Sequence, residues 1–238
     1  MERNINSLIG FGIEATDGII GEVEDFYFDD DTWKIRYLIV KTGSWLSGRK
    51  VLISMGAIIK KDQLNELIPV NLTKKQVKES PDIDTEKPVS RQQEIKLFEH
   101  YAWESYWLSG FYPGGYLGVS IPFPTLDEKA PTAGQTAEDT HLRSMKKITG
   151  IHVHATDGTI GYINDFIVDD LTWQVLSLVV DTHNWIGGKK LIVEISCVHS
   201  ISFSNPGVTL GISTAAVEDS KVYKEAAYSL HEPPIIRC

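Results

Sequence analysis

Apolar and polar residues alternate along short segments of this 238-residue chain, which is the pattern of strands that bury one face. In the stretch 33–42 the alternation places Trp33, Ile35 and Tyr37 on one face, while Leu38 and Val40 lie on the other. We therefore expect this strand to be covered on both sides near its end. Turn residues separate it from other apolar runs, which predict strands at residues 19–28, 51–53, 58–59 and 67–70.

The same pattern occurs a second time, 140 residues later. Between Gly10 and Lys50, 19 of 41 residues are identical to their partners at 150–190, without a gap. Two copies at so long a spacing indicate a duplicated domain, because solenoids need three or more short units. The second copy predicts strands at 159–168, 191–193, 198–203 and 208–210.

Turn and cap residues separate the strands in both copies. Asp17-Gly18 and Asp157-Gly158 favour tight hairpins, because glycine readily takes the positive φ that such turns need. Acidic turns follow at 29–32 and 169–172, and Thr73 with Gln76 has the spacing of a helix capping box. Each copy thus predicts about six short strands and a helical turn, a mainly β fold of the small-barrel or sandwich type.

Each copy contains, in order, the Asp-Gly hairpin, Gly21, Asp25-Phe26, the acidic turn, an apolar strand and a Trp-x-x-Gly-Arg/Lys-Lys segment. This order resembles the PRC-barrel, a domain shared by the cytoplasmic part of the photosynthetic reaction centre H subunit and a ribosome maturation factor family. The resemblance covers residues 8–80 and 148–220. It implies two PRC-type β-barrels in a protein that binds or tunes other macromolecules, and it brings no catalytic residue set.

The repeat and the resemblance together predict four parts of the chain. They are a first barrel at 1–82, a connecting segment at 83–142, a second barrel at 143–222 and a tail at 223–238. Small cores bury proportionally little surface, so we expect the two barrels to pack against each other or against a partner. Residues 217–230 additionally predict a terminal helix.

The connecting segment has the least repetitive sequence. Residues 90–107 have the spacing of an amphipathic helix, and 108–126 form an uncharged stretch whose glycines and prolines argue against a membrane span. We interpret 108–126 as an irregular aromatic arm, followed by a polar linker at 127–141. Large aromatic residues are enriched at interfaces but also close a protein's own core, so both roles stay open. The candidate partner contacts are Trp103, Tyr106, Trp107, Phe111 and Tyr112.

The formal net charge of −9 disfavours direct contact with nucleic acid, which depends on basic side chains at phosphates. The first ten residues lack the apolar segment of a secretory signal, and Cys197 and Cys238 do not make a disulfide framework. We expect a cytoplasmic bacterial protein with no membrane span, and a homodimer stays open.

Candidate chemistry is sparse in this sequence. Phosphate-binding loops, nucleophile elbows and zinc-protease motifs do not occur in it, so we expect no enzyme, no catalytic residues and no cofactor. The aspartates of the two acidic segments (Asp25, Asp29, Asp30, Asp31, Asp165, Asp169 and Asp170) lack the spacing of a calcium loop, and we interpret them as turn formers.

His152 and His154 share one face of a predicted strand, which leaves a metal site open as an alternative. Trp45 and Trp185 are interpreted as packing over one end of each barrel.

The expected function is therefore that of a non-enzymatic adaptor or regulatory protein that binds another macromolecule, foremost a protein. Two alternatives stay open. One is a sensor of a small ligand or metal, through the two histidines or the groove between the barrels. The other is a factor in RNA processing or ribosome assembly that contacts a basic ribosomal protein.

Overall fold

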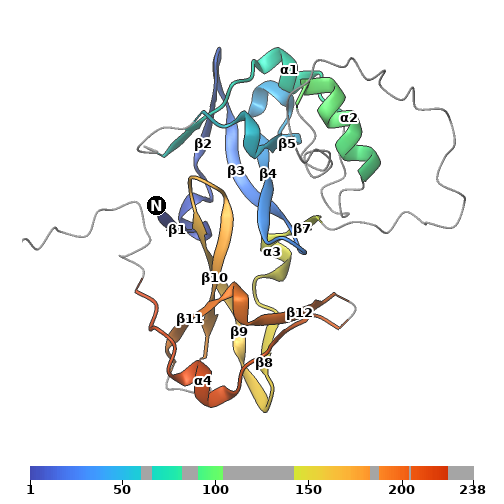
Figure 1. The fold of residues 1–238 in the computed structure, drawn as a ribbon. Coiled ribbons are helices and arrows are strands. Elements are labelled where there is room, and N and C mark those ends of the chain that lie inside the picture. The colour runs from blue at the N-terminus through green and yellow to red at the C-terminus, as the bar shows by residue number, and fades with distance from the viewer. Residues whose placement is uncertain (60–65, 82–90, 104–141, 183–187, 204, 225–238) are drawn as a thin grey trace, which may run out of the picture.

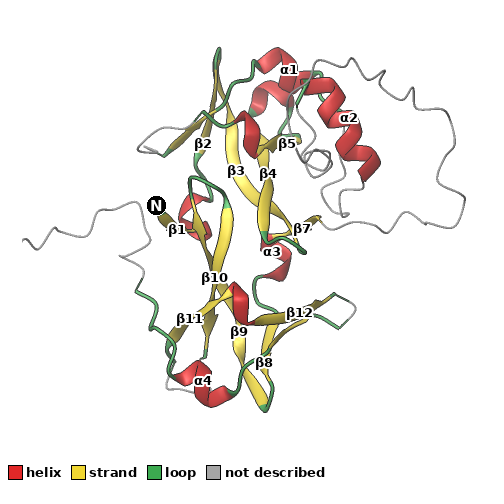
Figure 2. Cartoon of the chain, in the orientation of Figure 1, coloured by secondary structure: helices red, strands yellow, loops and turns green. Residues whose placement is uncertain are grey.

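The computed structural model describes residues 1–59, 66–81, 91–103, 142–182, 188–203 and 205–224 (Figure 1). Strands dominate this part of the chain, so the expected mainly β fold is confirmed. The molecule is elongated, with long hairpins along its middle; helices lie toward its two ends, and the short helix at Met145–Ile148 lies near the middle (Figure 2).

Two runs of strands follow each other along the chain. The first contains β1 (Glu2–Asn4), β2 (Gly12–Ala15), β3 (Gly18–Asp29), β4 (Lys34–Thr42), β5 (Lys50–Ser54), β6 (Leu67–Pro69) and helix α1 (Lys74–Lys78). Helix α2 (Arg91–Tyr101) comes next. The second run contains β7 (Leu142–Ser144), helix α3 (Met145–Ile148), β8 (His152–Ala155), β9 (Gly158–Asp169), β10 (Gln174–Asp181), β11 (Lys190–Glu194), β12 (Val198–Ser202), β13 (Gly207–Leu210) and helix α4 (Thr214–Glu218).

Strand pairing within the second run matches that of the first when 140 is added to each residue number. The β2–β3 hairpin pairs Gly12 with Glu22, and the β8–β9 hairpin pairs His152 with Tyr162. In both runs a parallel strand, β6 or β13, lies on the other side of the first strand of the hairpin. The sequence repeat is therefore accompanied by a repeated strand register.

A glycine marks the closest strand crossing in each run. A Cβ atom on Gly21 of β3 would collide with the carbonyl oxygen of Lys41 in β4. A Cβ on Gly161 of β9 would collide in the same way with the Asp181 carbonyl oxygen. Where two backbones come this close, only glycine fits without strain, because it has no Cβ.

The two runs also exchange a short strand with each other. Strand β1 pairs with β9 of the second run, placing Arg3 opposite Val168, and β7 pairs with β3 of the first, placing Arg143 opposite Phe28. At the hairpin tips, the Ile35 N–H donates to the Trp173 carbonyl and the Val175 N–H donates to the Trp33 carbonyl, both at 2.9 Å. We call this set of reciprocal contacts the exchange interface; it lies at the middle of the molecule in Figure 1.

The strands of the described residues form one 13-stranded sheet, in which nine strands follow the order β12-β13-β8-β9-β10-β4-β3-β2-β6. The other four pair beside this path: β1 with β9, β11 with β10, β5 with β4 and β7 with β3. This sheet does not close on itself. The strand pairing therefore shows one continuous open sheet, where two separate barrels were expected. The physical reason lies in the exchange interface: β1 and β7 each complete the other run, and a bridge between Lys34 and Gln174 joins the two central hairpins. The two runs share one sheet, which goes beyond the packing that we expected.

The core extends through the exchange interface. Phe26, Tyr27 and Phe28 are consecutive in β3 and all buried, because the β3 edge that would otherwise be open is covered by β7. Trp173 of the second run stacks on Phe26 with ring centroids 6.4 Å apart. The expectation that residues 33–42 are covered on both sides is confirmed, since Tyr37 and its next three neighbours are all buried.

The helix predictions have mixed outcomes. The capping box is confirmed: the Gln76 N–H donates to Thr73 Oγ1 at 3.3 Å, and the Thr73 N–H donates to Gln76 Oε1 at 2.9 Å. The amphipathic helix is present as α2, and residues 104–107 of its predicted range lie outside the described residues. Within the described residues, no helix combines the length and apolar character needed to cross a membrane.

The predicted terminal helix at 217–230 is wrong over the part that the structure describes. Helix α4 ends at Glu218, and the chain then runs along β11. The Ile192 N–H donates to the Lys221 carbonyl and the Tyr223 N–H donates to the Lys190 carbonyl, both at 2.8 Å. The outer edge of β11 offers these backbone partners, and pairing with them replaces helical hydrogen bonds.

Candidate functional site

The first predicted contact residue lies against the end of α2. Trp103 is half-buried; its ring stacks on Tyr101 with centroids 4.2 Å apart and meets Phe98 edge-on at 5.8 Å. The Trp103 N–H donates to the Phe98 carbonyl at 3.1 Å. The other four candidates, Tyr106, Trp107, Phe111 and Tyr112, lie outside the described residues.

Helix α2 is fastened to the first run by buried polar and apolar contacts. The Tyr37 hydroxyl of β4 donates to Glu94 Oε1 at 2.7 Å, and both side chains are buried. Leu97, Phe98 and Tyr101 belong to the same hydrophobic core as the sheet. Burial raises the pKa of the Tyr101 phenol. The helix is therefore an integral part of the first half, and it holds Trp103 in a defined position.

Two buried carboxylates lie at the exchange interface. Asp25 accepts hydrogen bonds from Ser144 Oγ at 2.5 Å, the Phe26 N–H at 2.7 Å and the Lys146 N–H at 3.0 Å. Because Ser144 and Lys146 begin the second run, this one side chain ties the two runs together. Burial raises the pKa of Asp25, against the opposing effect of these hydrogen bonds.

Asp165 makes the reciprocal set of bonds. It accepts from Asn4 Nδ2 at 3.0 Å, the Asn6 N–H at 3.1 Å and the Phe166 N–H at 2.7 Å, and burial raises its pKa as well. The sequence-based interpretation of Asp25 and Asp165 as turn formers is wrong. They lie inside long strands, and they cap the first turns of the exchanged segment from the other run.

The remaining aspartates of the acidic turns have the expected structural role. Asp29 accepts from the Thr32 N–H at 2.9 Å, and Asp169 accepts from the Leu171 N–H at 2.9 Å. The neighbouring Asp30 and Asp170 do more than form turns, because each pairs with an arginine of the exchanged strand. Their partners are Arg143 at 2.8 Å and Arg3 at 2.5 Å.

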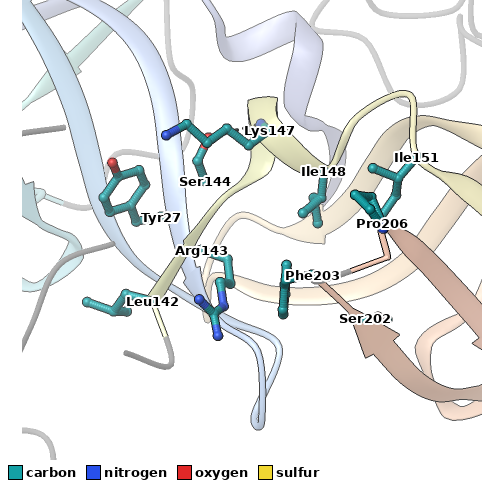
Figure 3. Close-up of a pocket in the computed structure, with 10 residues that line it drawn as sticks. All are labelled: Tyr27, Leu142, Arg143, Ser144, Lys147, Ile148, Ile151, Ser202, Phe203 and Pro206. Carbon is teal, nitrogen blue, oxygen red and sulfur yellow. Dashed lines mark hydrogen bonds between the residues drawn. The ribbon is translucent and has the colours of Figure 1, made fainter. Parts of the chain in front are cut away.

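A cleft of about 270 Å³ opens beside the exchange interface, between α3 and the β12–β13 hairpin (Figure 3). Its walls are mainly apolar, and its lining residues are Tyr27, Leu142, Arg143, Ser144, Lys147, Ile148, Ile151, Ser202, Phe203 and Pro206. The Arg143 guanidinium lies 4.0 Å from the centre of the Phe203 ring. Sequence reasoning missed this cleft, because three segments far apart in the chain build it.

The two histidines lie as predicted on one face of β8, with ring centroids 6.3 Å apart. His154 Nδ1 is 3.0 Å from the Thr159 hydroxyl of β9. Among the described residues, no group of three or more histidine, cysteine or acidic side chains is placed to hold a metal ion. The geometry therefore gives His154 a contact within the hairpin and brings no third ligand from the described chain.

Trp45 packs at the edge of the first run. Its indole N–H donates to the Ile20 carbonyl at 2.6 Å, while 36% of the residue remains exposed. The interpretation of this residue as a packing element agrees with that hydrogen bond, although it covers the edge of a hairpin and is only partly buried. Its counterpart Trp185 lies outside the described residues.

Comparison with known families finds that residues 1–77 match the family model of the PRC-barrel domain. This range contains β1 to β6 and most of α1, so the resemblance noted from the sequence is confirmed for the first run. No curated protein matches the chain.

Proposed function

We propose that this protein is a non-enzymatic adaptor or regulatory protein of the PRC-barrel type that binds another protein in the cytoplasm. In this proposal the second run arose by duplication of the first. The repeated strand register and the reciprocal exchange interface support a duplication, because unrelated domains have no reason to share either.

One observation carries the adaptor role: α2 is held rigidly and ends in an aromatic cluster. The buried Tyr37–Glu94 hydrogen bond fixes the helix, and Trp103 stacks on Tyr101 at its end. The chain continues beyond Glu104 into the uncharged aromatic stretch of residues 106–126. Binding hot spots are enriched in tryptophan and tyrosine, and this segment supplies both next to a helix that is fixed in place.

The charge of the chain suggests the chemistry of the partner. A net charge of −9 favours a partner with a basic surface, and such association is faster and tighter at low salt. A homodimer is the other assembly that remains open, and size measurement at several concentrations distinguishes it from a complex with a different protein.

The test compares the full chain with two triple variants. Tyr106→Ala with Trp107→Ala and Phe111→Ala removes aromatic residues of the connecting segment. Ile19→Ala with Ile59→Ala and Val222→Ala removes a comparable number of exposed apolar residues elsewhere. A partner is first captured from the host lysate by the unchanged chain, then purified and titrated against all three proteins.

We expect the aromatic variant to bind the purified partner at least about tenfold more weakly, since hot-spot truncations cost about 2 kcal/mol or more. The matched variant should stay within about threefold. Equal affinity of all three proteins, with unchanged circular dichroism, contradicts the assignment of the contact to these aromatic residues.

A second candidate function is the sensing of a small ligand. The cleft between α3 and the β12–β13 hairpin favours it, because small-molecule sites are concave and mostly apolar with a few polar groups. This candidate does not require the aromatic segment and can be tested separately.

A further inference from the structure

The cleft beside the exchange interface has an apolar wall and a cationic part. In Figure 3, Ile148, Ile151, Phe203 and Pro206 lie together on one side, and Lys147 extends toward the side of Tyr27. Its volume of about 270 Å³ is close to the lower end of the roughly 300–1,000 Å³ typical of small-molecule sites. A small organic molecule of modest size fits such a space.

The two charged residues of the lining are both basic, while Asp30 pairs with one of them, Arg143, from outside the lining. Arg143 and Lys147 belong to the lining, and the ten described lining residues include no carboxylate. Asp30 accepts from Arg143 Nε at 2.8 Å, and the Phe203 ring lies 4.0 Å from the guanidinium, so the arginine is held in place. Its Nη1 and Nη2 are the donors on the side away from Nε, and a guanidinium fork suits a carboxylate.

The corresponding positions of the first run have a different chemistry. Subtracting 140 places Glu2 at Leu142, Ser7 at Lys147, Gln63 at Phe203 and Glu66 at Pro206. Of the ten lining positions only Arg143 has an identical counterpart, Arg3, whereas 19 of 41 residues are identical between Gly10 and Lys50. Packing needs common to both halves therefore do not explain the choice of Lys147, Phe203 and Pro206 at this cleft.

We propose that this cleft binds a small amphiphilic carboxylate. The apolar body of the ligand packs against Phe203, Ile148 and Ile151, and its carboxylate accepts hydrogen bonds from Arg143 and Lys147. The inference rests on the second candidate function, whose ligand class it names, and it is independent of the adaptor role.

The probe for the test is 3-phenylpropionate, with 3-phenylpropionamide as its neutral counterpart of the same shape. Both are titrated into the full chain at low salt and followed by isothermal calorimetry and by backbone amide NMR. We expect saturable binding of the carboxylate, about tenfold tighter than that of the amide, because a hydrogen bond to a charged group contributes about 1.5 kcal/mol or more. The shifted amide signals should include those of residues 147–151, Ser202 and Phe203.

The cationic part and the apolar wall of the cleft are tested separately, by variants that replace a residue with its counterpart from the first run. Lys147→Ser should weaken the carboxylate about tenfold and leave the amide nearly unchanged. Phe203→Gln should weaken both compounds about fivefold or more through lost apolar contact. Lys146→Asn is the matched control, because this neighbouring lysine is 69% exposed and does not line the cleft.

Three results overturn the proposal. They are absence of saturable binding by 3-phenylpropionate, equal affinity for carboxylate and amide, and equal weakening by Lys146→Asn and Lys147→Ser. None of them affects the affinity of a captured protein partner for the aromatic segment, so the adaptor proposal stands or fails by its own titration.

Discussion

Replacing Asp25 with alanine removes the acceptor that joins β3 to the beginning of the second run. The carboxylate accepts from the Phe26 N–H, the Lys146 N–H and the Ser144 hydroxyl, at distances of 2.5 to 3.0 Å. Alanine fills little of the vacated space and accepts none of these bonds. The variant therefore leaves three donors at the exchange interface without their partner.

The magnitude follows from the burial of these donors. A buried donor left without an acceptor costs about 1–3 kcal/mol. The Phe26 N–H and the Ser144 hydroxyl are in buried bonds, whereas the Lys146 N–H is only partly buried and can be hydrated. Removing a carboxylate whose burial is unfavourable recovers part of the loss. We expect Asp25→Ala to lower the free energy of unfolding by about 3 kcal/mol, a large share of the roughly 5–15 kcal/mol typical of a domain.

The assay is equilibrium unfolding of the full chain in urea, followed by tryptophan fluorescence and circular dichroism. Asp165→Ala should cost a similar amount, because its bonds to Asn4, Asn6 and Phe166 are the reciprocal set. Asp31→Ala is the control, since Asp31 is exposed in the acidic turn. A cost of Asp25→Ala below about 1 kcal/mol, or equal to that of Asp31→Ala, refutes the view that this carboxylate holds the runs together.

Three further predictions concern the same scaffold. Gly21→Ala should destabilise the fold by more than about 3 kcal/mol in urea unfolding, because the added Cβ collides with the Lys41 carbonyl oxygen. At the control position Gly56, the nearest atom to an added Cβ is 3.6 Å away, so Gly56→Ala should cost about 1 kcal/mol or less. Similar costs for the two variants contradict the steric argument. Tyr37→Phe should lower the free energy of unfolding by about 1.5–3 kcal/mol, because it removes the buried donor to Glu94. Limited proteolysis should show faster cleavage near α2, since the helix loses this bond. Unchanged stability and an unchanged cleavage pattern would show that other contacts hold α2 in place. Burial raises the pKa of Asp25 above its ordinary 3.8, so the folded state binds more protons than the unfolded state from pH 3.8 up to the raised value, and the stability contributed by this group falls as pH rises through that window. Asp25→Asn should abolish this fall, so the difference in unfolding free energy between wild type and variant should shrink with rising pH; a constant difference argues against the raised pKa.

Local patterns predicted much of the strand order. The Asp-Gly hairpins, the strand at 33–42 and the Thr73–Gln76 capping box depend on residues close together in the chain, and these are present. The strand predicted at 58–59 is reduced to a single bridge between Ile58 and Val70. The acidic turns also follow from local chemistry, as the bonds of Asp29 and Asp169 show.

The exchange interface could not be predicted in this way. Strands β1 and β7 are three residues long, too short for an alternating pattern, and their hydrogen-bonding partners lie more than 110 positions away. The exchange explains why the sheet is continuous where two separate barrels were expected. It also explains why the carboxylates of Asp25 and Asp165 are buried within the predicted strands, because each binds donors of the other run.

Identity between the two runs separates positions that hold the fold from positions that are free to diverge. Asp25 and Asp165, Arg3 and Arg143, Trp33 and Trp173, and Gly21 and Gly161 are identical pairs, and each lies at a contact within or between the runs. The reciprocal contacts of these pairs impose the same requirement twice, whereas other interface positions differ, such as Asn4 and its counterpart Ser144. The cleft has no such requirement. Its residues Lys147 and Phe203 correspond in the first run to Ser7 and Gln63, which have a different chemistry. In a scaffold whose two halves share a strand register, cavity-lining residues that differ from their counterparts in the other half are therefore the ones in which a specific function is to be sought.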